Sequence, residues 1–129
     1  MIRSLEAHAH AERRYSNSVM TDPILEQEPK LAEIVRRLAA AYQPERIYLF
    51  GSVARGDRGP DSDYDLLVVV PDDAPAERRD GGLAYRALWG VGTAVDAVVC
   101  TSAWFHARTH LKASLAGTVL REGRLLHAV

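Results

Sequence analysis

Two aspartates, Asp63 and Asp65, stand two positions apart where an apolar run begins. On an extended chain this spacing places both side chains on one face of the strand, while Tyr64 between them faces the other way. Neighbouring carboxylates repel, so the pair makes physical sense where a hard cation neutralises it. Mg2+ is commonly held by one or two carboxylates together with the phosphates of a substrate. The spacing therefore predicts a magnesium site for a phosphorylated substrate.

A glycine turn upstream supplies what such a site needs. Gly51 ends the apolar run 47–50, and without a Cβ it lets the backbone turn sharply and lets a phosphate approach. Ser52 follows in the first turn of an expected short helix, where unpaired N–H groups favour an anion. Arg55 lies one helical turn further and can reach the same phosphates or a nearby acid. The order strand, glycine turn, short helix, strand indicates phosphoryl-transfer chemistry on a nucleotide.

At these residues the chain closely resembles the minimal nucleotidyltransferases of the DNA polymerase beta-like superfamily. The family motif reads Gly-Ser, a few residues, Arg-Gly, a short loop and Ser-Asp-x-Asp-Leu, and the chain has Gly51-Ser52-Val53-Ala54-Arg55-Gly56 and then Ser62-Asp63-Tyr64-Asp65-Leu66. Glycine motifs of P-loops and dinucleotide folds are absent from the sequence. The resemblance covers most of the segment 31–126 and implies an α/β nucleotidyltransferase fold, a small mixed β-sheet flanked by helices.

The resemblance also assigns roles to single residues. It implies that Gly51, Ser52, Arg55 and Ser62 bind the nucleotide, ATP. It implies that Asp63 and Asp65 are catalytic residues that hold Mg2+ against the triphosphate.

A third carboxylate, Asp96, completes the predicted site. It lies within the apolar run 94–99, where an acid is costly to bury unless it is paired or coordinated. The resemblance implies that Asp96 is either the remaining metal ligand or the base that accepts the proton of an attacking hydroxyl. Both roles require a position beside Asp65. If the side chain faces a helix layer instead, an ion pair with an arginine would explain it.

Composition predicts one domain and excludes several classes of protein. A chain of 129 residues with 47% hydrophobic residues can bury a single sizeable core. The net charge of −1 provides no basic surface for tight nucleic-acid binding. Cys100 is the only cysteine, so an intramolecular disulfide is excluded and a reducing cytoplasm is the expected location. No apolar stretch approaches membrane-spanning length.

The rest of the pattern predicts alternating helices and strands. Residues 1–22 are polar without a sustained period and are expected to form a flexible tail, with the nucleotidyltransferase domain at 23–129 and Met20 as a candidate natural start. Expected helices are 29–42, 76–89, one capped by Thr101, and 111–121, and expected strands are 46–50, 64–70, 93–100 and 124–128.

Other chemically capable residues have simpler explanations. His106 and His110 are four positions apart and could face one metal, but no acid accompanies them, so an ordinary helix surface is expected. Trp89 and Trp104 are interpreted as core or interface aromatics, either of which could border an adenine or a partner surface.

Small stand-alone members of this family resemble the antitoxin half of toxin–antitoxin modules of the type VII kind, paired with a HEPN-type toxin. Such antitoxins transfer AMP from ATP to a tyrosine of the toxin. The resemblance therefore implies a Mg2+-dependent adenylyltransferase that acts on a HEPN partner, in a homo- or hetero-oligomer. Two alternatives stay open: a small-molecule, aminoglycoside-type nucleotidyltransferase with an acidic pocket, and a non-catalytic antitoxin that acts by binding alone.

Overall fold

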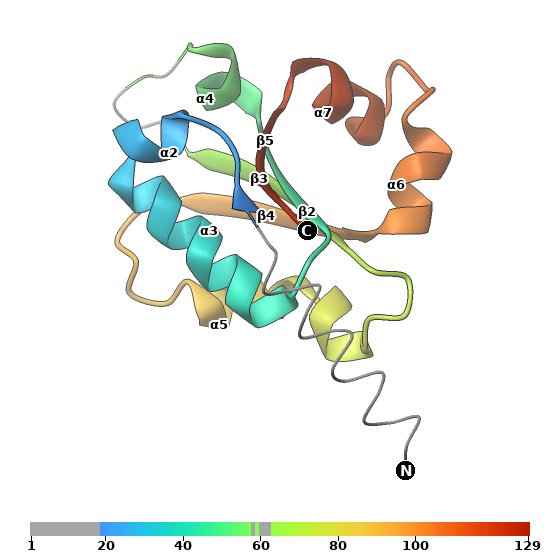
Figure 1. Ribbon diagram of the computed structural model, residues 1–129, viewed down its shortest axis with the longest axis horizontal. Helices are drawn as coiled ribbons and strands as arrows, with labels where there is room; N and C mark the ends of the chain where they lie inside the picture. The colour runs from blue at the N-terminus through green and yellow to red at the C-terminus, as the bar shows by residue number, and fades with distance from the viewer. Residues whose placement is uncertain (1–18, 58, 60–62) are drawn as a thin grey trace.

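A five-stranded mixed β-sheet forms the centre of the molecule (Figure 1). The computed structural model describes residues 19–57, 59 and 63–129. The strands are β1 (Val19–Met20), β2 (Arg46–Phe50), β3 (Tyr64–Val70), β4 (Val95–Thr101) and β5 (Arg124–Ala128). The helices are α2 (Ile24–Gln27), α3 (Pro29–Tyr42), α4 (Gly51–Arg55), the 3-10 helix η1 (Ala76–Arg79), α5 (Gly81–Ala87), α6 (Ser102–Arg108) and α7 (Leu115–Glu122).

The strand order is β1-β5-β2-β3-β4, and only one of its pairings is parallel among the described residues. β2 runs antiparallel to both β3 and β5, whereas β3 and β4 run parallel. A parallel pair needs a crossover connection, and the segment 71–94 with η1 and α5 provides it. The crossover brings the start of β4 back beside the start of β3.

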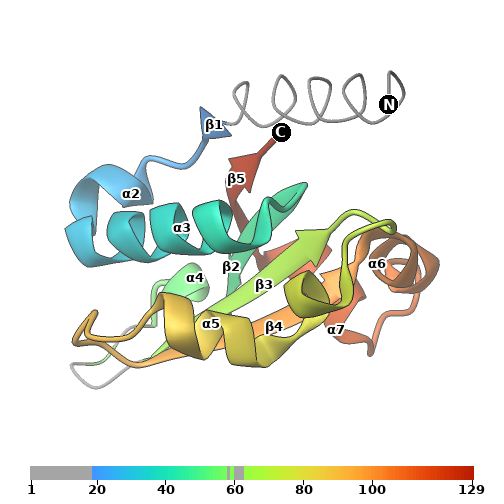
Figure 2. The same cartoon turned by 90° about the horizontal axis from the view of Figure 1, so that it is seen from below.

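Helices cover both faces of the sheet, as the turned view shows (Figure 2). Pro29 occupies the first turn of α3, where its missing N–H is tolerated, and the buried stripe Leu31, Ile34, Val35 and Leu38 packs with Leu66 and Val68 of β3. α5 joins the same layer through Ala84. This layer fixes the position of β3 from one side.

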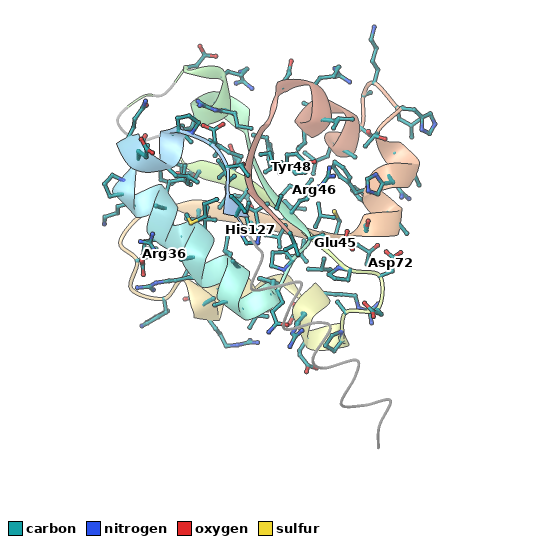
Figure 3. All side chains as sticks on the ribbon, viewed as in Figure 1. Arg36, Glu45, Arg46, Tyr48, Asp72 and His127 are labelled. Atoms are coloured by element: carbon teal, nitrogen blue, oxygen red, sulfur yellow. The ribbon has the colours of Figure 1, made fainter. Side chains whose placement is uncertain are left out.

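The opposite face packs against α6 and α7. Tyr48 of β2 stacks on Phe105 of α6 with ring centroids 5.5 Å apart, and the Arg46 guanidinium donates a hydrogen bond of 2.9 Å to the Tyr48 hydroxyl (Figure 3). Leu67 and Val69 of β3 belong to this second core. Because side chains alternate along a strand, Asp65 lies on the same face as Leu67 and Val69.

The strands β2, β3 and β5 and the helix α3 confirm the predicted bounds. The expected single helix 76–89 is wrong: it divides at Asp80, whose carboxylate accepts the Gly82 N–H and caps α5. The expected helix 111–121 begins only at Leu115, because the Ser114 hydroxyl caps it by accepting the Gly117 N–H. Thr101 caps α6 as expected, and β4 is shifted to Val95–Thr101.

The prediction that the whole segment 1–22 is a tail is wrong for its last four residues. Val19 and Met20 pair with β5, and the Thr21 N–H donates to the Leu126 carbonyl at 3.0 Å. Asp22 accepts two hydrogen bonds from the Arg124 guanidinium, at 2.9 and 2.6 Å. A two-residue strand has no period to detect in the sequence, and these contacts join positions about a hundred residues apart. Residues 1–18 lie outside the described residues.

None of the helices in the described ranges is long and apolar enough to cross a membrane.

Candidate active site

Asp65 and Asp96 are direct partners in the parallel β3–β4 pair. On its other side, Asp65 pairs with Phe50, the last residue of β2. Directly paired residues of neighbouring strands project to the same face, so both carboxylates lie on the face that α6 and α7 cover further along the sheet. The structure thus places Asp96 beside Asp65, as both roles proposed for it require.

The charges of the three predicted acids act on one another. The pKa of Asp65 is raised, first by burial and then by the negative charges of Asp96 and Asp63, while Arg55 acts in the opposite direction. Asp63 is exposed and immediately precedes β3, and Asp96 is also exposed. An Asp65 carboxylate that is hard to ionise between two like charges is what a bound cation would relieve.

Gly51 allows the turn of the chain into α4 to lie against Asp65. Its φ of +75° is in the left-handed region, and a Cβ at this position would collide with the Asp65 carboxylate. Phe50, at the N-cap of α4, provides no side-chain acceptor for the first turn of the helix. Backbone N–H donors and a carboxylate therefore meet at one end of the sheet with nothing larger than a glycine between them.

Two further nucleotide-binding candidates, Ser52 and Arg55, lie on α4. Ser52 is half-buried in the first turn of α4, and its carbonyl accepts the Asp57 N–H at 2.9 Å. Arg55 is exposed and donates to Asp57 at 3.3 Å, in an ion pair whose two side chains are 49% and 68% exposed. Ser62 lies outside the described residues.

A magnesium ion fits the described residues if protein carboxylates and substrate phosphates coordinate it together, rather than protein side chains alone. Within the described ranges, no three His, Cys, Asp or Glu side chains lie close enough together to hold a metal by themselves. The prediction that Asp63, Asp65 and Asp96 together form a three-ligand metal site is therefore not met by the protein alone, and His106 and His110 form no such site either. Asp65, whose carboxylate lies near the negative charges of Asp96 and Asp63, could with one of these neighbours supply the one or two carboxylates that a protein usually contributes to a Mg2+ site. Substrate phosphates would supply the remaining ligands.

A pocket beside Asp96 was not predicted from the sequence. It has a volume of about 500 Å³, lies between α5 and β4, and includes Asp96 in its lining. Tyr85 and Trp89, on its rim, are 70% and 71% exposed, so Trp89 is not a core residue. The signal available in the sequence was Gly90 and Gly92 after Trp89, both of which adopt positive φ and shape the loop.

Residues 29–125 match the family described as "Nucleotidyltransferase domain". The chain belongs to this family. The predicted enzyme class is therefore confirmed: the protein is a nucleotidyltransferase.

This nucleotidyltransferase is similar to a Methanocaldococcus jannaschii protein that is provisionally named a protein adenylyltransferase. The two are 32% identical over 105 residues, which cover 80% of this chain and 100% of the relative.

Two crystal structures are similar to the nucleotidyltransferase. One, of a provisionally named nucleotidyltransferase from Sulfolobus solfataricus, has a TM-score of 0.51 at 24% identity and covers 78% of this chain and 79% of its own, which confirms the predicted fold. The other is described as a toxin-antitoxin with AMP-PNP; its TM-score is 0.51 at 26% identity, covering 74% of this chain and 72% of its own.

Proposed function

We propose that this nucleotidyltransferase is a Mg2+-dependent adenylyltransferase that moves AMP from ATP to a tyrosine hydroxyl of a HEPN-type toxin partner, as the antitoxin of a two-gene module. The observation that carries the proposal is the Asp65–Asp96 pair beside the Gly51 turn. The name of the archaeal relative supports adenylyl transfer to a protein. The similar structure that is described as a toxin-antitoxin with an ATP analogue supports the nucleotide and the kind of partner.

The nucleotide half of the site consists of the Gly51 turn, Arg55 and the Asp63–Asp65 pair. Mg2+, when bound, supplies charge neutralisation and polarises the α-phosphate. Gly51, without a Cβ, lets the Asp65 carboxylate lie directly against the turn, and the Ser52 hydroxyl adds a donor for a phosphate. Arg55 is free to turn towards the phosphates, because its exposed pair with Asp57 is worth only about 0–1 kcal/mol.

The transfer step follows from the position of Asp96. A tyrosine oxygen attacks the α-phosphorus of ATP, the bond from that phosphorus to the oxygen bridging to the β-phosphate breaks, and pyrophosphate leaves. Asp96 accepts the proton of the hydroxyl, since it is exposed and stands one strand away from the metal-binding carboxylate. Most of the rate comes from holding the two reactants in line.

The pocket next to Asp96 favours a neutral acceptor over a cationic antibiotic. A polycationic small molecule needs several carboxylates, whereas Asp96 is the only acid that lines this pocket among the described residues. The tyrosine side chain has no charge to neutralise and suits a rim that carries Tyr85 and Trp89.

The test is incubation of the protein with ATP labelled at the α-phosphate, Mg2+ and the product of the neighbouring gene. We expect label on a tyrosine of that product and pyrophosphate in equal amount. Asp65→Asn and a chelator are the negative controls, and a parallel reaction with an aminoglycoside as acceptor tests the small-molecule alternative. Complex formation without label, under conditions in which ATP is bound, would contradict transfer and favour a non-catalytic antitoxin.

A further inference from the structure

The outer side of β4 has backbone groups available for a further strand. β4 is the last strand of the sheet, and no described strand pairs with its outer side (Figure 1). The Tyr64 N–H donates to the Ala94 carbonyl at 3.1 Å. In a parallel pair, alternate residues direct both backbone groups to the same neighbour, so this bond fixes the pattern along β4.

It follows that Asp96 and every second residue after it direct their N–H and C=O groups to β3. Val95, Ala97 and Val99 direct theirs to the outer edge. Three consecutive outward positions are enough to recognise an extended chain, because their spacing is that of a neighbouring strand.

Two pockets lie end to end along this edge. The first, of about 500 Å³, is lined by Val95–Ala97 and by α5 with the loop that follows it. The second, of about 390 Å³, is lined by residues 98–101 between Arg79 of η1 and Trp104 of α6. Together their linings include every residue of β4 from Val95 to Thr101, and Asp96 belongs to the lining of the first.

The wall beside Asp96 is held in place from behind. The Arg37 guanidinium donates to the Trp89 carbonyl at 3.0 Å, and the Lys30 ammonium donates to the Val91 carbonyl at 3.1 Å. Both cations come from α3, so the loop after α5 is tied to the core. The Tyr85 and Trp89 rings meet edge to face at 5.7 Å while remaining largely exposed. Exposed aromatic rings on a fixed backbone are typical of surfaces that bind another protein.

The chemistry of the two pockets selects a polypeptide of low charge. Asp96 and Arg79 are the only charged residues that line the two pockets in the described part of the chain. The Cys100 thiol in the second pocket is uncharged, since burial raises its pKa to about 11. Neither a polycation nor a polyphosphate finds complementary charge there, whereas an extended apolar segment finds both backbone partners and apolar walls.

We propose that an extended segment of the acceptor protein joins the sheet as a strand beside β4 and thereby presents its hydroxyl to Asp96. A residue opposite Asp96 on the added strand has its side chain on the same sheet face, with its Cβ roughly 5 Å from the Cβ of Asp96. That separation suits proton transfer from a hydroxyl that reaches towards Asp65. The inference rests on the proposed function for the nature of the reacting group. The place and manner of docking rest on the β4 edge.

Amide hydrogen exchange measured by NMR on the full chain tests the pairing. In the protein alone, the amides of Asp96, Val98 and Cys100 should be protected and those of Val95, Ala97 and Val99 should exchange fast. The probe is a capped peptide in which threonine and valine alternate around one tyrosine, at millimolar concentration. We expect the three outward amides to exchange at least about tenfold more slowly with the peptide. Unchanged exchange would overturn the proposal, as would protection that rises with protein concentration alone, which would identify a second copy of this chain as the occupant.

Variants separate edge pairing from a general effect. Ala97→Pro removes one outward N–H and leaves the bonds to β3 intact, so peptide protection should disappear while Mg-ATP affinity is retained. Ala97→Val keeps the N–H and should bind the peptide as the parent does. Should Ala97→Pro fail to fold, Trp89→Ala removes a side chain that is 71% exposed and should weaken the peptide at least about tenfold. Parental peptide binding by both disruptive variants would contradict the proposal.

The same peptide distinguishes failure of docking from failure of the proposed function. With labelled ATP and Mg2+, protection of the outward amides without label on the tyrosine would leave the docking edge in place and refute transfer. Label without protection would support transfer and refute the docking edge.

Discussion

Asp96 stands directly opposite Asp65 across the parallel β3–β4 pair, and, after burial, its charge is the largest cause of the raised pKa of Asp65. The two carboxylates therefore repel each other when no cation is bound. A substitution that removes this repulsion should keep or raise the stability of the protein and lower its activity.

Replacement of Asp65 tests both the expected effect on stability and the expected loss of activity. A folded-state pKa above the ordinary 3.8 means that the contribution of Asp65 to stability is fully present below the unfolded pKa and is lost as pH rises through the folded pKa. With chelator, Asp65→Asn should therefore melt at or above the parental temperature at neutral pH, and the difference should vanish in acid. Transfer should fall on the order of 100-fold or more. Asp73→Asn, an exposed loop aspartate, is the control for both melting and activity.

ATP should bind with useful affinity only when a divalent cation is present. Asp63, Asp65 and the triphosphate would otherwise repel one another at close range. Calorimetric titration with Mg2+ and with chelator measures the difference directly. Equal affinity under the two conditions would refute a metal shared between carboxylates and phosphates.

Asp96→Asn distinguishes the roles that remain open to this residue. If Asp96 is the base, Mg-ATP affinity should persist while single-turnover transfer falls by roughly 10²–10⁴. If Asp96 is a required metal ligand, affinity should fall as well. We expect the first outcome, because Asp63 and Asp65 would remain to hold the metal. Parental affinity, transfer and melting temperature together would remove Asp96 from the site.

Gly51→Ala and Gly56→Ala form a matched pair. Both positions have positive φ, at +75° and +81°, so both variants should lose about 1–2 kcal/mol of stability from the backbone alone. A Cβ at Gly56 meets nothing within 4 Å, whereas one at Gly51 meets the Asp65 carboxylate. Gly51→Ala should therefore lose Mg-ATP affinity in addition, as measured by calorimetry. Equal nucleotide binding by the two variants would show that the close approach at Gly51 is unimportant.

The start of the described chain should contribute to stability through Asp22. Burial acts to raise the pKa of Asp22, but hydrogen bonds from Arg124 and the Ile24 N–H outweigh it and lower the pKa overall. This contribution is present above the unfolded pKa and is lost as pH falls, the reverse of Asp65. A chain that starts at Ile24 should melt below one that starts at Met20, and Asp22→Asn in the longer chain should lose about 1–2 kcal/mol. Identical melting curves for the two starts would show that this segment does not stabilise the domain.

Local patterns explain which parts of the fold could be predicted. The apolar run of β3 and the helical stripe from Leu31 to Leu38 are short-range signals, and both elements were found within their expected bounds. The prediction that Asp63 and Asp65 share one face used only the two-residue period of a strand; in the structure Asp63 immediately precedes β3. The family resemblance added Asp96.

Contacts between distant segments explain what could not be predicted. The pairing of Asp65 with Asp96 depends on the register of two strands joined by a long crossover. The Asp22–Arg124 contact joins residues 102 positions apart, and the local sequence around neither residue predicts the contact. The pocket beside Asp96 exists because α5 divides from η1 at Asp80 and because Lys30 and Arg37 tie down the loop behind it.

The crossover between β3 and β4 gives the enzyme a modular design. The segment from β2 through α4 to β3 carries Gly51 and Asp65, whereas the crossover carries Tyr85 and Trp89 and leads into Asp96. Under the proposed function, the groups that hold the donor and those that meet the acceptor are thus consecutive blocks of sequence. That order predicts that grafting the second block between relatives would exchange the acceptor while the first block keeps the nucleotide.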